Sequence, residues 1–351
     1  MEERGAARKV TLRGWGGVAA MAVACALTAV FALLLPVTQQ RPADGKGTTT
    51  SYASGGVAEG RQARAEDCDP GVEGKEPERS LRPSGSESGS AVRAIKDRGY
   101  LSVGVDQNSY RWGYRDPNST AKTSELEGFD IDLAHEIAGE ILGDKDAIRF
   151  RAIPTNERIP AIQRGDVDMV VRTMTISCDR LEDVAFSTAY FQTGQQVLAP
   201  KSSKIEGYGP TLAGKRVCTA AGSTAESSLR DGQRKPVDDG GLPRSTDIST
   251  TVPNQLDCLV RLQLGEVDAV VTDGALAASQ AAQDPTVELK GEPYTKEFYG
   301  VAMKKGADDL VRRVNQVLVD YRKSDGWQDS YDHWLKPALG PSSGPPAPKY
   351  K

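Results

Sequence analysis

Histidine is scarce in this chain of 351 residues, which contains only His135 and His333. Two histidines are too few for a metal site built on imidazole ligands. Basic residues are not in excess either, because 44 Lys and Arg are outweighed by 48 Asp and Glu, which gives a net charge of −4. Nucleic-acid binding needs a basic surface that neutralises phosphates. We therefore predict no metal, no cofactor and no nucleic-acid partner.

Large apolar residues are almost absent from residues 39–90, which are rich in Gly, Ser, Thr, Pro, Glu and Arg. Such a segment cannot bury enough surface to offset the entropy of ordering, so we predict a flexible linker. The Pro-rich residues 341–351 are a shorter segment of the same kind, predicted to be disordered. The remainder is long enough for one large domain or two lobes.

One long apolar run, Val18–Leu35, is interrupted only by Thr28 and follows a basic segment, Arg4 to Arg13. This length suffices to cross a bilayer core, and basic residues on one flank stay cytoplasmic. We predict a cytoplasmic n-region and an uncleaved transmembrane signal anchor in residues 1–38. Lipidation of Cys25 and ordinary signal cleavage stay open as alternatives. All three place the rest of the chain outside the cytoplasm, single-pass or lipid-anchored in the first two.

Besides Cys25 the chain has an even number of cysteines: Cys68, Cys178, Cys218 and Cys258. In an exported chain this pattern predicts two disulfides, for which the sequence alone allows three pairings. Free buried thiols are the alternative.

An internal repeat indicates two similar lobes. Residues 161–171, AIQRGDVDMVV, recur one hundred residues later at 261–271 as RLQLGEVDAVV, with six identities in eleven positions. Each copy is typical of a helix end, a Gly stop and a short buried strand. A helix that leads into a buried strand, twice in one chain, indicates two parallel α/β layers. Further strands are predicted at 101–105 and 214–222, and a helix at 308–324.

Several motifs, in the family's order and spacing from about residue 91 to 339, resemble the periplasmic-type solute-binding proteins of polar amino-acid ABC importers, family 3. They are Gly128–Leu133, Thr173–Arg180, Val184–Ser187, Gly214–Val217, Gly222–Thr224, Val267–Asp273 and Tyr299–Val301. The resemblance implies a type II periplasmic-binding-protein-like fold, in which two α/β lobes are joined by two crossing strands around a central cleft. Lobe 1 would combine 91–193 with 300–340, and lobe 2 would be 194–299.

Three further segments, Asp67–Pro70, Ser80–Pro83 and the Pro-rich tail, resemble the glutamate- and glutamine-binding proteins of high-GC Gram-positive bacteria. That subgroup usually carries a lipoprotein cysteine, from which the poor site at Cys25 departs. Within the implied lobes, Cys218 opens lobe 2 and Cys258 lies in the helix before the second repeat. We therefore predict the pairs Cys218–Cys258 and Cys68–Cys178.

The resemblance also implies roles in an amino-acid site. Arg180 would bind the α-carboxylate with its planar fork, and Asp273 would accept the ammonium. Thr173 and Thr175 would line the cleft. Asp106 would contact the ligand or orient Arg180. The hydroxyls and backbone N–H groups at a helix start would add donors: Ser223 and Thr224.

Side-chain specificity centres on Arg172, which ends the first repeat's strand. A buried cation needs an anionic partner, and a ligand's side-chain carboxylate is one candidate. An internal pair with Asp106 is the alternative, and Arg111 is a second candidate reader. We expect glutamate first, then aspartate or glutamine.

Three functions remain in competition. Transport, with delivery of the ligand to an ABC permease by a monomeric binding protein, is the prediction. An amino-acid sensor that acts on a membrane signalling partner would have the same site. An enzyme of the lyase type would need an acid–base group in place of a binding group, and neither histidine lies in a cleft segment, so we predict no enzyme.

Overall fold

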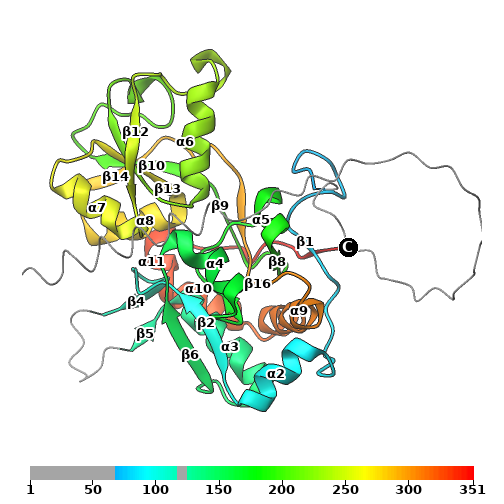
Figure 1. Cartoon of the computed structure of the whole chain (residues 1–351). Coiled ribbons are helices and arrows are strands. Elements are labelled where there is room, and N and C mark those ends of the chain that lie inside the picture. Colours follow the sequence, from blue (N-terminus) through cyan, green and yellow to red (C-terminus); the bar gives the residue numbers. More distant parts are fainter. Residues whose placement is uncertain (1–67, 117–124) are drawn as a thin grey trace, which may run out of the picture. The chain divides into compact units, whose positions relative to one another are not determined.

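The computed structural model describes residues 68–116 and 125–351 (Figure 1). The predicted anchor, Cys25 and most of the predicted linker lie outside these residues. None of the helices formed by the described residues is long and apolar enough to cross a membrane.

The first sheet has five strands in the order β6-β2-β7-β16-β8. Its central strand β2 runs parallel to β6 and β7, whereas β16 is antiparallel to β7 and β8. Apolar residues at every second position of β2, Leu101, Val103 and Val105, are fully buried. The strands are β2 Leu101–Val105, β6 Ile148–Ala152, β7 Met169–Val170, β8 Val184–Phe186 and β16 Ala302–Lys304.

Seven α-helices belong to the same part of the described chain. They are α2 Ser90–Arg98, α3 Phe129–Leu142, α4 Arg158–Arg164, α5 Cys178–Asp183, α9 Asp308–Lys323, α10 Gly326–Trp334 and α11 Lys336–Leu339. The predicted helix at 308–324 is thus confirmed as α9. It buries Leu310, Val314 and Val317, at helical spacing, in the core of the first sheet.

The second sheet has the strand order β12-β11-β13-β10-β14. Strand β13 is parallel to β11 and antiparallel to β10. The strands are β10 Gln195–Pro200, β11 Arg216–Ala220, β12 Asp247–Val252, β13 Ala269–Asp273 and β14 Val287–Lys290. The helices between them are α6 Thr224–Arg234, α7 Gln255–Gln263 and α8 Gly274–Gln283.

The internal repeat corresponds to equivalent units in the two sheets. Helix α4 ends at Gly165 and leads into β7, and α7 ends just before Gly265 and leads into β13. Both glycines have positive φ, 74° and 69°, which glycine adopts without the steric cost of a Cβ. The predicted succession of helix, Gly stop and buried strand is confirmed in both copies.

Two antiparallel strands carry the chain between the sheets: β9 Phe191–Thr193 and β15 Glu297–Tyr299. All strands of the second sheet lie between residues 195 and 290, and those of the first come from 101–186 and 302–304. We keep the division into lobe 1 (91–193 with 300–340) and lobe 2 (194–299) as a proposal that this strand membership supports.

The end of the predicted linker and the predicted disordered tail are ordered, so both expectations are wrong for these residues. Strand β1 Arg79–Ser80 pairs in parallel with β17 Lys349–Tyr350. Ser80 is buried and donates a hydrogen bond to the carbonyl of Phe186 over 2.7 Å. Lys349 Nζ lies 2.9 Å from a carboxylate oxygen of Glu78. Composition describes each segment in isolation, whereas here two polar segments gain order by pairing with each other against the folded domain.

The remaining short elements lie in connections. A small sheet with the strand order β3-β4-β5 is formed by β3 Asn108–Ser109, β4 Gly113–Arg115 and β5 Leu126–Glu127. The described residues also form three 3-10 helices in connections: η2 Thr155–Glu157, η3 Pro210–Leu212 and η4 Val237–Asp239.

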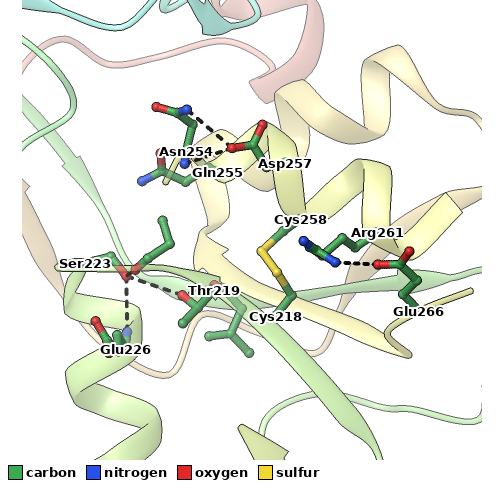
Figure 2. The surroundings of a disulfide bond; sticks show 12 residues. Cys218, Thr219, Ser223, Glu226, Asn254, Gln255, Asp257, Cys258, Arg261 and Glu266 are labelled. Carbon is green, nitrogen blue, oxygen red and sulfur yellow. Dashed lines mark hydrogen bonds and ion pairs between the residues drawn. A yellow bond between two sulfur atoms is a disulfide. The ribbon is translucent and has the colours of Figure 1, made fainter. Parts of the chain in front are cut away.

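Both disulfides join the cysteines that the sequence analysis paired. Cys68 is bonded to Cys178 at the start of α5, and Cys218 in β11 is bonded to Cys258 in α7, each with a Cα–Cα distance of 5.6 Å. The second bond fixes α7 to the strand that leads into α6 (Figure 2).

Candidate functional site

Polar side chains gather where parallel strands of both sheets end. Asp106 follows β2 and Arg172 follows β7, whereas Asp273 ends β13 and Ser223 follows β11. Carboxyl ends of parallel strands are where open α/β sheets hold ligands. The crossing strand β15 adds Glu297 and Tyr299 to this group.

Arg180 bridges the two parts of the chain. Its Nη1 donates to the carbonyl of Thr175 over 2.7 Å, and its Nη2 donates to the carbonyl of Gly222 over 3.1 Å. The side chain is placed by α5, a helix of six residues capped by Ser177. Burial lowers the pKa of Arg180, although nearby Glu297 and Asp273 oppose this effect.

A second buried arginine, Arg158 at the start of α4, points to the same carbonyl. Its Nε donates to the carbonyl of Thr155 over 2.9 Å and its Nη2 to that of Gly222 over 3.4 Å. Burial lowers the pKa of Arg158 well below its ordinary value, and the cations Arg180 and Arg172 lower it further. Among the described residues, no carboxylate lies within 4 Å of the guanidinium of Arg158 or Arg180.

Two buried acids face these cations. Glu297 accepts hydrogen bonds from the hydroxyls of Thr175, over 2.6 Å, and Thr224, over 2.9 Å. Asp273 accepts from the hydroxyl of Tyr299 and from the amide of Gln195, which also donates to Glu297 over 3.1 Å. Burial raises the pKa of Asp273 to about 7, and the charge of Glu297 adds to this effect.

The structure contains the internal pair that was the alternative for Arg172. Its Nη2 lies 2.9 Å from a carboxylate oxygen of Asp106, and both side chains are buried. Asp106 in turn accepts from the hydroxyl of Ser109 over 2.8 Å. Arg172 therefore has its counter-charge within the protein, which was the alternative to its contact with a ligand.

Thr173 and Ser223 have mainly structural partners. The backbone N–H of Thr173, a residue with φ of 43°, donates to the carboxylate of Asp130 over 2.9 Å. Burial raises the pKa of Asp130 to about 7. Ser223 caps α6 by accepting from the backbone N–H of Glu226 over 3.2 Å. Capping does not exclude a ligand contact by the free N–H groups of the same helix end.

Arg111 stands apart from the cation pair. Its guanidinium carbon lies 5.0 Å from the centre of the Tyr110 ring, and its carbonyl accepts from the backbone N–H of Phe129. The residue occupies a turn with φ of 66°. These contacts assign it to the turn before β4, and no described hydrogen bond or ion pair links it to Arg180 or Asp273.

Sequence reasoning missed Arg158, Gln195 and Glu297. Arg158 has a local signal, because a charged residue begins an otherwise apolar helix, Ile159 to Ile162. Gln195 and Glu297 lie beside or within strands of three to six residues, which are too short to show a periodicity that separates buried from exposed positions.

The sequence of this chain is similar to those of known amino-acid-binding proteins. Residues 101–337 match the model of the bacterial extracellular solute-binding proteins, family 3. The glutamine-binding protein of an ABC transporter of Bacillus subtilis is 34% identical over 245 residues, which cover 70% of this chain and 84% of that protein. A glutamate-binding protein of Corynebacterium glutamicum is 28% identical over 244 residues, which cover 66% of this chain and 77% of that protein.

The fold is similar to that of solved amino-acid-binding proteins. An ancestral amino acid-binding protein, described as a precursor of cyclohexadienyl dehydratase, superposes with a TM-score of 0.61 at 29% identity and covers 70% of this chain and 100% of that one. The architecture is thus the type II periplasmic-binding-protein fold that the sequence predicted.

Proposed function

Because the chain belongs to the bacterial extracellular solute-binding proteins of family 3, we propose that it captures an amino acid for an ABC importer. The preferred ligand in this proposal is glutamate, followed by aspartate or glutamine. The named relatives support glutamate and glutamine as ligands, because they are glutamine- and glutamate-binding proteins.

The observation that carries the proposal is the separation of charge in the site. Arg158 and Arg180 have no carboxylate within salt-bridge distance in the described part of the chain, and Asp273 and Glu297 have no cation within that distance. Buried charges without a partner are costly. A zwitterion offers a carboxylate to the arginines and an ammonium to the acids, and so neutralises both sides at once.

The second arginine supports an acidic side chain on the ligand. One guanidinium suffices for an α-carboxylate, because its fork binds both oxygens. Arg158 is then left with three backbone carbonyls as partners, those of Thr155, Arg172 and Gly222. A side-chain carboxylate would neutralise it, and an amide oxygen would be a weaker acceptor.

The cellular setting is part of the proposal. We infer that the site works outside the cytoplasm, attached to the membrane by the predicted segment at 18–35, and that an ABC permease receives the ligand. Membership of the high-GC Gram-positive subgroup is also a proposal. The glutamine-binding protein of Bacillus subtilis has a higher identity to this chain than the glutamate-binding protein of Corynebacterium glutamicum, so identity alone does not assign the subgroup. Binding rather than catalysis is proposed, because the charged groups left without an internal ion pair among the described residues, Arg158, Arg180, Asp273 and Glu297, each have a role in holding a charged ligand.

A thermal-shift screen of the full-length chain against the twenty amino acids tests the proposal. Tight binding to the folded state raises the unfolding temperature, so glutamate is expected to give the largest shift. Calorimetry on Arg180→Ala should then show a loss of about 2–5 kcal/mol. Arg313→Ala is the matched control, since Arg313 is a buried arginine in α9 that contacts Glu140. No shift with any amino acid, or an Arg180→Ala affinity within threefold of wild type, would refute the proposed site.

A further inference from the structure

The buried pair of Arg172 and Asp106 has an additional partner from across the cleft. Arg172 Nη1 donates to the hydroxyl of Thr155 over 3.0 Å, a neighbour on the side of the first sheet. Its Nη2 donates to the side-chain oxygen of Asn254 over 3.1 Å. Asn254 lies between β12 and α7 of the second sheet. The pair is therefore closed off by a residue from the opposite lobe.

Two more hydrogen bonds cross at the same place. The backbone N–H of Thr155 donates to the carbonyl of Pro253 over 3.0 Å, and its hydroxyl donates to the side chain of Gln255 over 3.2 Å. None of these atoms belongs to Arg158, Arg180, Asp273 or Glu297, although Arg158 donates to the backbone carbonyls of Thr155 and Arg172. Residues 253–255, which we name the α7 tip, thus contact lobe 1 through atoms other than those proposed to hold the ligand.

The α7 tip is held rigidly within lobe 2. Asn254 and Asp257 form a reciprocal capping box at the start of α7. The carbonyl of Gln255 accepts from the side chain of Gln280 in α8 over 2.9 Å. One turn further, Cys258 is bonded to Cys218 in β11, as Figure 2 shows together with the capping box. A movement of lobe 2 away from lobe 1 must therefore carry the α7 tip with it.

We propose that the α7 tip is a closure latch, which docks onto the Arg172–Asp106 pair whether or not a ligand is present. The latch stabilises the closed arrangement through groups that no ligand touches. It therefore contributes the same factor to the affinity for every ligand, because each ligand must be held by the closed form. The inference refines the proposed function, since the latch regulates access to the same cleft. Arg172 then governs how tightly the protein closes, while selection among ligands belongs to other residues.

Asn254→Ser tests the latch without removing the helix cap. Serine caps a helix about as well as asparagine, but its shorter side chain does not reach Arg172. Gln263→Ala is the matched control, because Gln263 lies at the other end of α7 and donates only to Asp284, within lobe 2. Closure is measured in the full-length, ligand-free protein by fluorescence transfer between labels at the exposed positions 93 and 234.

The latch requires that Asn254→Ser increases the distance between the labels in ligand-free protein, while Gln263→Ala does not. It also requires that glutamate and glutamine lose affinity by the same factor, about tenfold for the loss of one hydrogen bond to a charged group. An unchanged distance, or an equal opening by Gln263→Ala, would overturn the latch. A loss confined to glutamate would overturn its independence of the ligand. If the variant opens the ligand-free protein but no amino acid binds to either form, the latch stands and the proposed function fails.

Discussion

Replacement of Arg158 by glutamine gives the sharpest test of ligand choice. The Arg158 side chain is 3% exposed, and its described partners are backbone carbonyls and no acid. A hydrogen bond to a charged group contributes about 1.5–3 kcal/mol, and one between neutral groups about 0.5–1.5 kcal/mol. If Arg158 binds the side-chain carboxylate of glutamate, the replacement should cost glutamate about 1–2 kcal/mol more than glutamine. The ratio of the two affinities should then fall by about 5- to 30-fold.

Arg172→Gln is the matched comparison, because it removes a neighbouring arginine that is also buried. Its partner Asp106, 2.9 Å away, would be left buried without a cation. Such a loss weakens the folded cleft itself and so should affect both ligands alike. The glutamate-to-glutamine ratio is therefore expected to stay at the wild-type value, even if both affinities fall.

Titration calorimetry of both amino acids against wild type and the two variants separates the roles. A ratio that stays within threefold of wild type in Arg158→Gln would show that Arg158 serves the structure of the cleft and does not read the ligand. A glutamate-to-glutamine ratio that changes in Arg172→Gln would instead show that Arg172 contacts the ligand's side chain, as the sequence analysis first predicted.

Asp273, the Cys68–Cys178 disulfide and the C-terminal strand give further measurable expectations. Asp273→Asn should weaken binding by about 2–5 kcal/mol, because the ligand's ammonium loses its anionic partner, and calorimetry showing a wild-type Kd would contradict this. The pKa of Asp273 is raised to about 7 in the ligand-free protein, and a bound ammonium must lower it. Binding therefore releases a proton, and the affinity should fall as the pH drops below about 7, by at most about tenfold per pH unit, whereas Asp273→Asn should lose this dependence. Loss of the Cys68–Cys178 bond, which spans 110 residues, should lower the Tm by on the order of 10 °C in a calorimetric scan of Cys68→Ser/Cys178→Ser, and an unchanged Tm would show that the bond adds no constraint. Deletion of residues 349–351 removes the partner of β1, so trypsin should cleave after Arg79 faster than in wild type, and an equal rate would mean that β17 does not protect the segment.

Much of the architecture was predictable because it depends on patterns of a few consecutive residues. The repeated Gln-x-Gly-x-Val-Asp-x-Val-Val segment indicated two equivalent helix–strand units, and both appear with Gly165 and Gly265 at the turns. A Gly that ends a helix and a run of β-branched residues act within a few positions of each other, so one sequence suffices to recognise them. The cysteine pairs followed from the order of the same units.

The site was predictable only in part. Arg180 and Asp273 were expected from the motifs in which they lie, and in the structure Asp273 is near enough to Arg180 to oppose the effect of burial on its pKa. Glu297 was missed although it accepts from Thr175, because the two residues are 122 positions apart and no local pattern connects them. The ordered tail was missed for the same reason, since β17 pairs with a strand about 270 residues earlier.

The sequence by itself determined the fold class and the two similar lobes, and its motifs indicated Arg180 and Asp273 as candidate binding residues. Only the tertiary structure decided which charges neutralise each other: Arg172 is paired with Asp106, while Arg158 and Arg180 are left facing Asp273 and Glu297. The physical reason is that the cost of burying a charge depends on the partner within a few ångströms. Such a partner comes from whichever strand end the fold brings alongside, and spacing along the chain does not record it.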